Sequence, residues 1–359
     1  MLSYILKKIH HSFWTLLGVV TTIFFLFNVL PGDPAQMMLG QNEDQTQLAI
    51  VKQKYGFDQP VLTQYLYYLN DLSPLSFHSN DSDDYTFLES HSYSYQPLFK
   101  TAKNTVVFKF PYLRTSFTKQ GKEVSQILKE TLPNTIILAV ASIFVALTLG
   151  LFLGVISALY KDHWVDKTIL VVSTFGMSLP SFFSAILAAW IFGFLLHHYT
   201  GLEMTGSLYE LDDFGEVYQL KLKNLILPAM VLGIRPLAVV TQLMRNSLLE
   251  VFNQDYIRTA RAKGLSEFKI ILHHAMKNAL NPVVTAISGW FASLLAGAVF
   301  VEYIFSWNGL GKEIVNALNT LDLPVIMGAV LIIALTFVLI NILVDVIYTY
   351  LDPKIKLNP

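Results

Sequence analysis

The sequence of 359 residues contains no cysteine and few charged side chains. Without cysteine, disulfides, thiolate metal sites and cysteine nucleophiles are excluded. Charged residues make up 14% of the chain and hydrophobic residues 53%, whereas about 25% of a soluble domain is charged. The net charge of −1 provides no basic field of the kind that binds nucleic acid. These shortages together indicate an integral membrane protein that has no nucleic-acid partner.

The sequence also lacks the machinery of an ATPase or another enzyme. No Gly-x-x-x-x-Gly-Lys-Ser/Thr phosphate loop occurs, and "GLGK" at 309–312 is too short and is not followed by serine or threonine. Adjacent histidines at 197–198 and 273–274 point about 100° apart on a helix, so they are poorly placed to chelate a metal. We therefore expect a chain that is not an enzyme and binds no cofactor or metal.

Six segments are apolar over roughly the 20 residues that a membrane-spanning helix requires. They cover residues 13–30, 135–159, 168–196, 225–249, 283–301 and 325–350. We interpret the first as a retained span rather than a signal peptide, because no small-x-small cleavage site follows it. The third contains Pro180, which predicts a kink, and the fourth contains Pro228, Arg235 and Pro236. The expected fold class is an all-α membrane protein with six transmembrane helices.

Loop charges predict the orientation of these spans, since lysine and arginine concentrate on the cytoplasmic side. With the N-terminus inside, the outer short loops hold only Lys221, Lys223 and Lys312, whereas the inner loops and tail hold Lys7, Lys8, Lys161, Lys167, Arg245, Arg258, Arg261, Lys263, Lys269, Lys277, Lys354 and Lys356. The expected divisions are a cytoplasmic start and first span (1–30), an external insertion (31–130), a five-span core (131–350) and a cytoplasmic tail (351–359). Both termini are then cytoplasmic.

The insertion has its own local signals. The stretch 43–69 shows helical spacing with a break at Gly56 and Pro60, and "NTVVFKF" at 104–110 is typical of a strand. We expect helices at the edges of the insertion and a small folded cap.

A few polar or small residues inside the spans are candidates for a translocation path. Arg235 is costly in a bilayer unless it faces a cavity or reaches the interface, and both placements stay open. Ser178 and Pro180 lie in a stretch that unwinds or simply kinks, and Glu302 is expected at the outer mouth. Asp345 is a candidate partner of Arg245 or Lys161.

A basic segment (residues 255–280) lies between the fourth and fifth spans. Leu265, Phe268, Ile271 and Leu272 recur at helical spacing, and Gly264 lies near the centre. This pattern predicts two short helices around a glycine bend on the cytoplasmic surface. A surface that docks a partner protein and a loop that rests on lipid headgroups both fit these residues.

The basic segment, "DYIRTARAKGLSEFKIILHHAMKNALNPV", resembles the cytoplasmic coupling motif of bacterial ABC-importer permeases of the dipeptide/oligopeptide/nickel subfamily. "VLPGDPAQMMLG", "LMRNSLLEV" and "VEYIFSWNGLGKEIVNAL" resemble other parts of the same subfamily, in the same order. Departures include a longer external loop near 73–110, Arg114 in place of glycine, Asn308 in place of proline and Leu321 in place of arginine.

The resemblance implies a bacterial inner-membrane permease subunit, most readily for di- or oligopeptides. Its implied partners are a sister permease, two cytoplasmic ATPases that use ATP and Mg, an external substrate-binding protein and the lipid bilayer. The implied ATPase-coupling residues are Tyr256, Arg258, Thr259, Ala260, Arg261, Ala262, Lys263, Gly264, Leu265 and Phe268. The alternatives are import of nickel, glutathione or another small solute, and a membrane-anchored scaffold that transports nothing.

Overall fold

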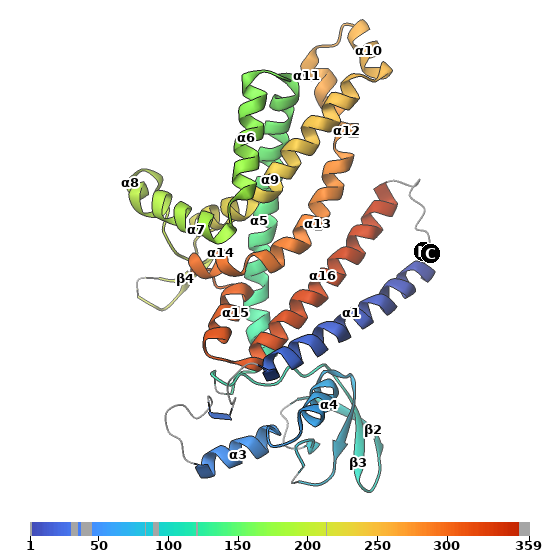
Figure 1. Ribbon diagram of the computed structural model, residues 1–359, viewed down its shortest axis with the longest axis vertical. Coiled ribbons are helices and arrows are strands. Elements are labelled where there is room, and N and C mark those ends of the chain that lie inside the picture. The colour runs from blue at the N-terminus through green and yellow to red at the C-terminus, as the bar shows by residue number, and fades with distance from the viewer. Residues whose placement is uncertain are drawn as a thin grey trace. The chain divides into compact units, whose positions relative to one another are not determined.

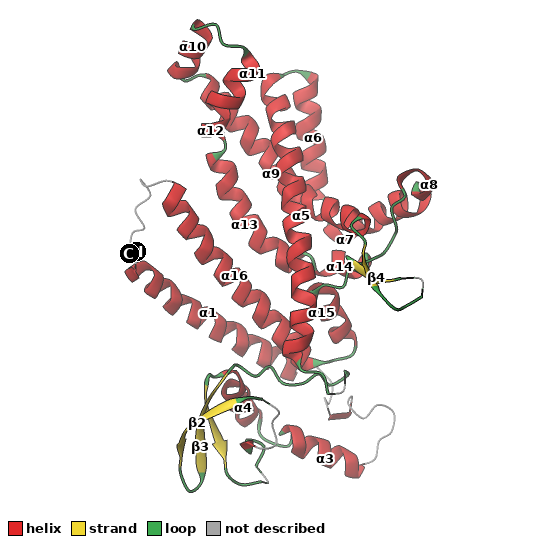
Figure 2. Cartoon of the chain, turned by 180° about the vertical axis from the view of Figure 1, so that it is seen from behind, coloured by secondary structure: helices red, strands yellow, loops and turns green. Residues whose placement is uncertain are grey.

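The computed structural model describes residues 2–29, 35–36, 45–82, 84–88, 93–119, 121–212 and 214–351. Within these residues the chain is mostly helical, as expected, and it also has two small sheets (Figure 2). All but the first residue of the predicted tail lies outside the described residues. The chain divides into two compact units. The first is Met1–Lys8, Thr131–Val315 and Leu335–Pro359, and the second is Ile9–Glu130 and Asn316–Ala334.

Long apolar helices dominate the described residues. Four are long and apolar enough to cross a membrane, namely α1 (Leu2–Val29), α5 (Val124–Leu159), α9 (Lys223–Phe252) and α16 (Leu323–Leu351). A fifth candidate is a bent pair made of α6 (Trp164–Ser178) and α7 (Ser181–Ala188), which continues into the π-helix η2 (Ala189–Leu195). The helix α13 (Asn281–Gly297) is apolar but shorter.

The prolines of these helices act differently at different places. Pro180 stands between α6 and α7, and Leu179 before it is extended, with φ −74° and ψ 137°. A residue that precedes proline avoids the α region, so the helix stops there and the pair bends by 105°. Pro228 and Pro236, in contrast, lie inside α9, which runs unbroken for 30 residues.

The first unit is built around α9, which packs against α5, α6, α7 and α13 (Figure 1). Two glycines of α5 allow the closest of these contacts. A Cβ atom on Gly150 would lie 2.8 Å from Cγ1 of Val240, and one on Gly154 would lie 2.7 Å from Cβ of Met244. These two glycines have the Gly-x-x-x-Gly spacing that lets helices pack closely.

Charged side chains of the first unit lie where elements meet. Arg245 of α9 holds Asp166 of α6 with two bonds, from Nε to Oδ1 at 2.7 Å and from Nη2 to Oδ2 at 2.6 Å. Asp345 of α16 forms an ion pair with Lys8 of α1. The expectation that Asp345 pairs with Arg245 or Lys161 was therefore wrong, because Arg245 is taken by Asp166 and Lys8 reaches Asp345.

Glu302 lies on α14 (Val299–Ile304) and is completely buried. Its Oε2 accepts hydrogen bonds from the backbone N–H groups of Gly311 and Lys312, at 2.7 and 3.2 Å, at the start of α15 (Leu310–Asn319). A Cβ on Gly309 would lie 2.4 Å from this oxygen. The glycines of "GLGK" therefore make room for a carboxylate that caps a helix.

The second unit contains the described part of the insertion. The helices α3 (Gln45–Tyr55) and α4 (Val61–Leu72) precede a three-stranded antiparallel sheet. Its strands are β1 (Leu75–Ser79), β2 (Tyr95–Lys100) and β3 (Asn104–Lys109), with β3 in the middle. This confirms the helical break at Gly56 and Pro60 and the strand predicted from "NTVVFKF".

A buried ion pair holds this unit together. Nε of Arg114 donates to Oδ2 of Asp71 at 2.8 Å, and its guanidinium lies over the rings of Tyr68 and Tyr85 at 5.3 and 5.7 Å. Burial raises the pKa of both tyrosines, which therefore stay neutral beside Asp71. Arg114 adopts φ 65°, a region that favours glycine, so its side-chain contacts hold a strained backbone.

The remaining described elements are short. They are the helices α8 (His197–Thr200), α10 (Asp255–Ala262), α11 (Glu267–Ile270) and α12 (Met276–Ala279), the π-helix η3 (Ile271–Ala275), and the hairpin strands β4 (Tyr209–Leu211) and β5 (Tyr218–Leu220).

Replacing Arg114 with glycine should lower the stability of the second unit. Glycine relieves a backbone strain of about 1–2 kcal/mol, but a buried carboxylate that loses its partner costs about 3–5 kcal/mol. Limited proteolysis and hydrogen exchange of the full-length protein would show faster opening. The double variant Arg114→Gly with Asp71→Asn should recover part of the loss, and a single variant as stable as wild type would contradict this account.

The stability of the protein should also depend on the ionisation of Glu302. Burial raises the pKa of this carboxyl from 4.5 to about 7, against the opposing effect of hydrogen bonds that include those of Lys312 and Gly311. The folded state therefore holds the proton more tightly than the unfolded state. The contribution of Glu302 to the free energy of unfolding is greatest below pH 4.5, falls as the pH rises towards 7 and then levels off. The total decrease is about 3 kcal/mol.

Thermal unfolding of the purified protein across this pH range measures the effect. Glu302→Gln should flatten the fall, whereas Glu216→Gln, at an exposed glutamate, should keep the wild-type profile. An unchanged slope in Glu302→Gln would refute the assignment.

Candidate functional site

The basic segment folds as a helical hairpin with a left-handed glycine. The helix α10 ends at Ala262, Gly264 has φ 76°, and α11 starts at Glu267. No atom lies within 4 Å of a Cβ built on Gly264, so the backbone conformation alone demands glycine here. This confirms the predicted pair of short helices around a glycine bend.

One side of this segment is buried against α9. Ile257, Ala260, Ile270, Ala275 and Ala279 are buried in one core. The same core contains Met244 and Leu248 of α9 and Ala158 of α5. Small and branched apolar side chains thus pack α10–α12 against the end of the long helix α9.

The other side of the segment is open and combines apolar and basic groups. Phe268 is 74% exposed and Leu272 48% exposed. Most of the predicted coupling residues are exposed too, namely Tyr256, Arg258, Thr259, Arg261, Ala262, Lys263 and Gly264, whereas Leu265 is half-buried and Ala260 buried. Exposed Phe268 and Leu272 beside Lys263 and Lys269 form a surface that fits an apolar groove with acidic edges.

Two contacts within the segment were not foreseen from the sequence. Arg261 binds Glu267 across the glycine bend, with Nε to Oε1 at 2.8 Å and Nη2 to Oε2 at 3.2 Å. This pair lowers the pKa of Glu267 and stiffens the turn. The amide of Asn278 donates to the hydroxyl of Tyr256 at 2.8 Å, which joins the two arms. The six-residue spacing of Arg261 and Glu267 gave no helical signal because it spans a bend.

A second candidate site is a small cavity beside the bend between α6 and α7. It encloses about 60 Å³ and is lined by Gly176, Leu179, Ser181, Ser184, Val231, Leu232, Ile234, Arg235, Trp290, Ser293 and Leu294. Arg235 is exposed and has no ion-pair partner among the residues that the structure describes. The cavity thus combines one cation with serine hydroxyls, a set that binds carboxylates and carbonyls.

The four predicted path residues fall in two places. Arg235 lines this cavity, and Ser178 and Pro180 flank its lining residue Leu179. Glu302 instead caps α15 and is fully buried. Within the described ranges no cluster of three or more histidine, aspartate or glutamate side chains is arranged to hold a metal.

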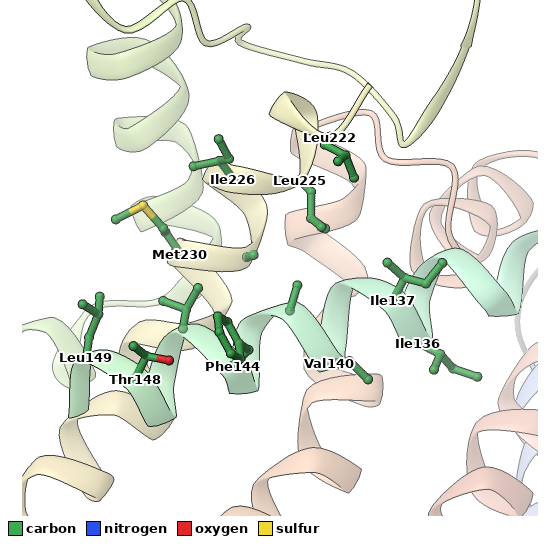
Figure 3. A pocket seen from close by; sticks show the side chains of 13 residues that line it. Ile136, Ile137, Val140, Phe144, Thr148, Leu149, Leu222, Leu225, Ile226 and Met230 are labelled. Atoms are coloured by element: carbon green, nitrogen blue, oxygen red, sulfur yellow. The ribbon is translucent and has the colours of Figure 1, made fainter. Parts of the chain in front are cut away.

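A wide apolar groove runs between α5 and the start of α9 (Figure 3). It has a volume of about 730 Å³, and Thr148 is the single polar residue among those that line it. Figure 3 shows Phe144, Val140 and Ile137 of α5 beside Ile226 and Met230 of α9. Such a surface suits lipid chains or another apolar helix, and it offers no chemistry to a polar solute.

Comparison with known proteins agrees with these features. The family described as "Binding-protein-dependent transport system inner membrane component" matches residues 150–357, and its N-terminal counterpart matches residues 1–85. The dipeptide transport system permease protein DppB of Alkalihalophilus pseudofirmus is 32% identical over 370 residues, which cover 99% of this chain and 100% of that protein. The di/tripeptide transport system permease protein DppB of Pseudomonas aeruginosa is 32% identical over 372 residues, with 99% of both chains covered.

Among solved structures, an inward facing conformation of the MetNI methionine ABC transporter is similar at 17% identity, with a TM-score of 0.49. The similarity covers 63% of this chain and 97% of that one. The match over more than half of the sequence, together with relatives that align end to end, identifies the family. This chain belongs to the binding-protein-dependent transport system inner membrane components, a family of multi-pass transporter subunits.

Proposed function

We propose that this chain is one permease subunit of an ATP-driven peptide importer. It forms half of a translocation path with a different sister permease, and an external binding protein delivers the substrate. Its helices make six spans with both termini in the cytoplasm and the insertion outside. The names of the relatives support a di- or oligopeptide as substrate.

The observation that carries the coupling role is the two-sided basic segment. Its buried side is part of the same core as α9, and its open side presents Phe268 and Leu272. A partner ATPase that binds this open side can therefore displace α9 without bending a flexible loop. ATP and Mg are used by that partner, since this sequence has no phosphate loop. A conformational switch from 1:99 to 99:1 needs about 5.5 kcal/mol, which this contact has to transmit.

Arg235 supports the assignment of a peptide path. An unpaired arginine inside an apolar helix is costly unless it faces a polar solute or water. The cavity beside the Pro180 bend supplies both the cation and three serine hydroxyls. A peptide carboxylate or carbonyl matches this set, whereas a nickel ion does not, because a guanidinium repels a cation.

Replacing Phe268 with serine should detach the ATPase and leave the fold intact. The side chain is 74% exposed, so its loss costs the isolated subunit little, but an apolar contact worth about 1.5–3 kcal/mol disappears from the complex. ATPase binding should weaken roughly 10- to 100-fold, measured by co-purification and by transport in vesicles. Phe214→Ser, at an 87% exposed phenylalanine near β4, is the matched control. Equal ATPase retention in both variants would count against docking here.

Replacing Arg235 with methionine should reduce import of peptides that carry a free carboxylate. A charge-assisted hydrogen bond contributes about 1.5–3 kcal/mol, so uptake should fall by about tenfold or more. Arg235→Lys should retain part of the activity. Import of the same peptide as its amide is the internal control. If amide and acid lost uptake equally, Arg235 would not recognise the carboxylate.

Uptake of nickel and glutathione by the same vesicles tests the alternative substrates. If the wild-type protein imported no peptide, and if nickel import persisted in Arg235→Met, nickel would replace the peptide as the proposed substrate.

A further inference from the structure

One face of the three-stranded sheet in the insertion is apolar and open. Leu75 pairs with Phe108, and Phe77 and Phe99 both pair with Val106, so these side chains lie on the same face. Their exposures are 53% for Leu75, 65% for Phe77, 71% for Phe99 and 49% for Phe108, and Phe110, two residues beyond Phe108, reaches 87%. We refer to Leu75, Phe77, Phe99, Phe108 and Phe110 as the aromatic face.

The opposite face of this sheet is buried and polar. Ser76, His78 and Thr105 are at most 5% exposed. Nδ1 of His78 bonds the carbonyl of Thr86 at 2.9 Å, and the hydroxyl of Thr105 donates to Oδ1 of Asn80 at 2.7 Å. An antiparallel sheet with one solvent-exposed face usually has its polar residues on that face. Here the satisfied polar groups fix the register with the phenylalanines outside, because a slip of one residue would reverse both faces.

The strands of the aromatic face carry no acidic side chain, although the exposed Asp81 follows β1 beside the β2–β3 turn, where the N–H of Asn80 donates to the carbonyl of Lys103 at 3.0 Å. The three strands and the β2–β3 turn contain no aspartate or glutamate. Lys103 lies in the turn and is exposed, whereas Lys100 pairs with Thr105 and so starts from the opposite, polar face. Aromatic side chains near a lysine are the composition of surfaces that insert at the boundary between anionic headgroups and acyl chains.

A single short helix, α4, connects the sheet to a candidate membrane span, α1. The side-chain amide of Asn70 in α4 donates a hydrogen bond to the carbonyl of Phe77 at 2.9 Å, and its Oδ1 accepts one from the N–H of Phe77 at 2.8 Å. On its other side α4 packs on α1, where Tyr65 bonds the hydroxyl of Thr21 at 2.6 Å and Tyr68 stacks on Phe24. Since α1 is apolar enough to cross the bilayer over Lys7–Phe27, the sheet is tied near the membrane surface. This proximity favours lipid over a protein partner.

We propose that the aromatic face inserts into the headgroup region of the bilayer and that Lys103 binds an anionic lipid phosphate. The insertion is then anchored to the membrane on the side where it lies. This anchoring does not depend on which solute the protein carries.

Site-directed labelling tests the anchor directly, because the natural chain has no cysteine to mask. Phe99→Cys and Phe110→Cys would each carry a fluorophore in the full-length protein, in nanodiscs of phosphatidylcholine and phosphatidylglycerol. Lipids with a nitroxide near the headgroup should quench both labels several-fold more than a label at Asp58→Cys, an exposed site of the same unit. Lys103→Glu should reduce the quenching in phosphatidylglycerol and leave it unchanged in pure phosphatidylcholine, whereas Lys100→Glu, on the opposite face of the sheet, should change neither.

Two results would overturn the proposal. One is quenching at positions 99 and 110 no stronger than at position 58. The other is labels that lipid does not quench and that the purified binding protein or sister permease shields, which would make the aromatic face a protein interface. Transport by the labelled variants, measured in parallel, reports on the proposed function separately.

Discussion

The burial of the basic segment against α9 is the contact on which the rest of the arrangement depends. Ile257, Ile270, Ala275 and Ala279 are fully buried, and they contact the same core as Met244 and Leu248. Because this side is entirely apolar, the charged residues are confined to the opposite side, around Phe268. A force applied there reaches α9, and α9 also carries Arg235 near its middle. The proposed coupling surface and the cavity are therefore joined through one continuous helix, α9.

The ionic side chains of the first unit differ in whether the described residues provide them with ion-pair or hydrogen-bond partners. Asp166 has Arg245 and the hydroxyl of Ser157, and Oε2 of Glu302 has the start of α15, while Oε1 of Glu302 is buried without a hydrogen-bond partner among the described residues. Removing one partner of such a buried group costs several kcal/mol, so these residues are fixed in place. Arg235 has no ionic partner among the described residues and opens into a cavity with serine hydroxyls. Under the proposed function, the carboxylate of an incoming peptide supplies the partner for its charge.

Patterns that act locally were readable from the sequence, and pairings across the fold were not. Apolar length located each long helix, Pro180 located the bend, and Gly264 located the turn of the basic segment. The predicted partner of Asp345 was wrong because the sequence does not show which helices lie side by side. Until that is known, lysines and arginines of several loops are equally plausible partners. That Glu302 caps α15 was not readable from the sequence, since nothing in one dimension reveals that two glycines open space around its carboxylate. The strand of the insertion was found, but alternation alone did not tell which of its faces is buried.

The departures from the family pattern replace backbone features with side-chain contacts. Arg114, where glycine is usual, holds φ 65° by binding Asp71. Asn308, where proline is usual, donates its N–H to Oγ of Ser207 at 3.0 Å and accepts from Nζ of Lys312 at 2.9 Å. Proline has no N–H and could make neither bond. Both changes lie away from the basic segment, which matches the coupling motif residue by residue. The proposed ATPase contact thus keeps the family pattern, whereas the changes at Arg114 and Asn308 give this chain side-chain contacts of its own.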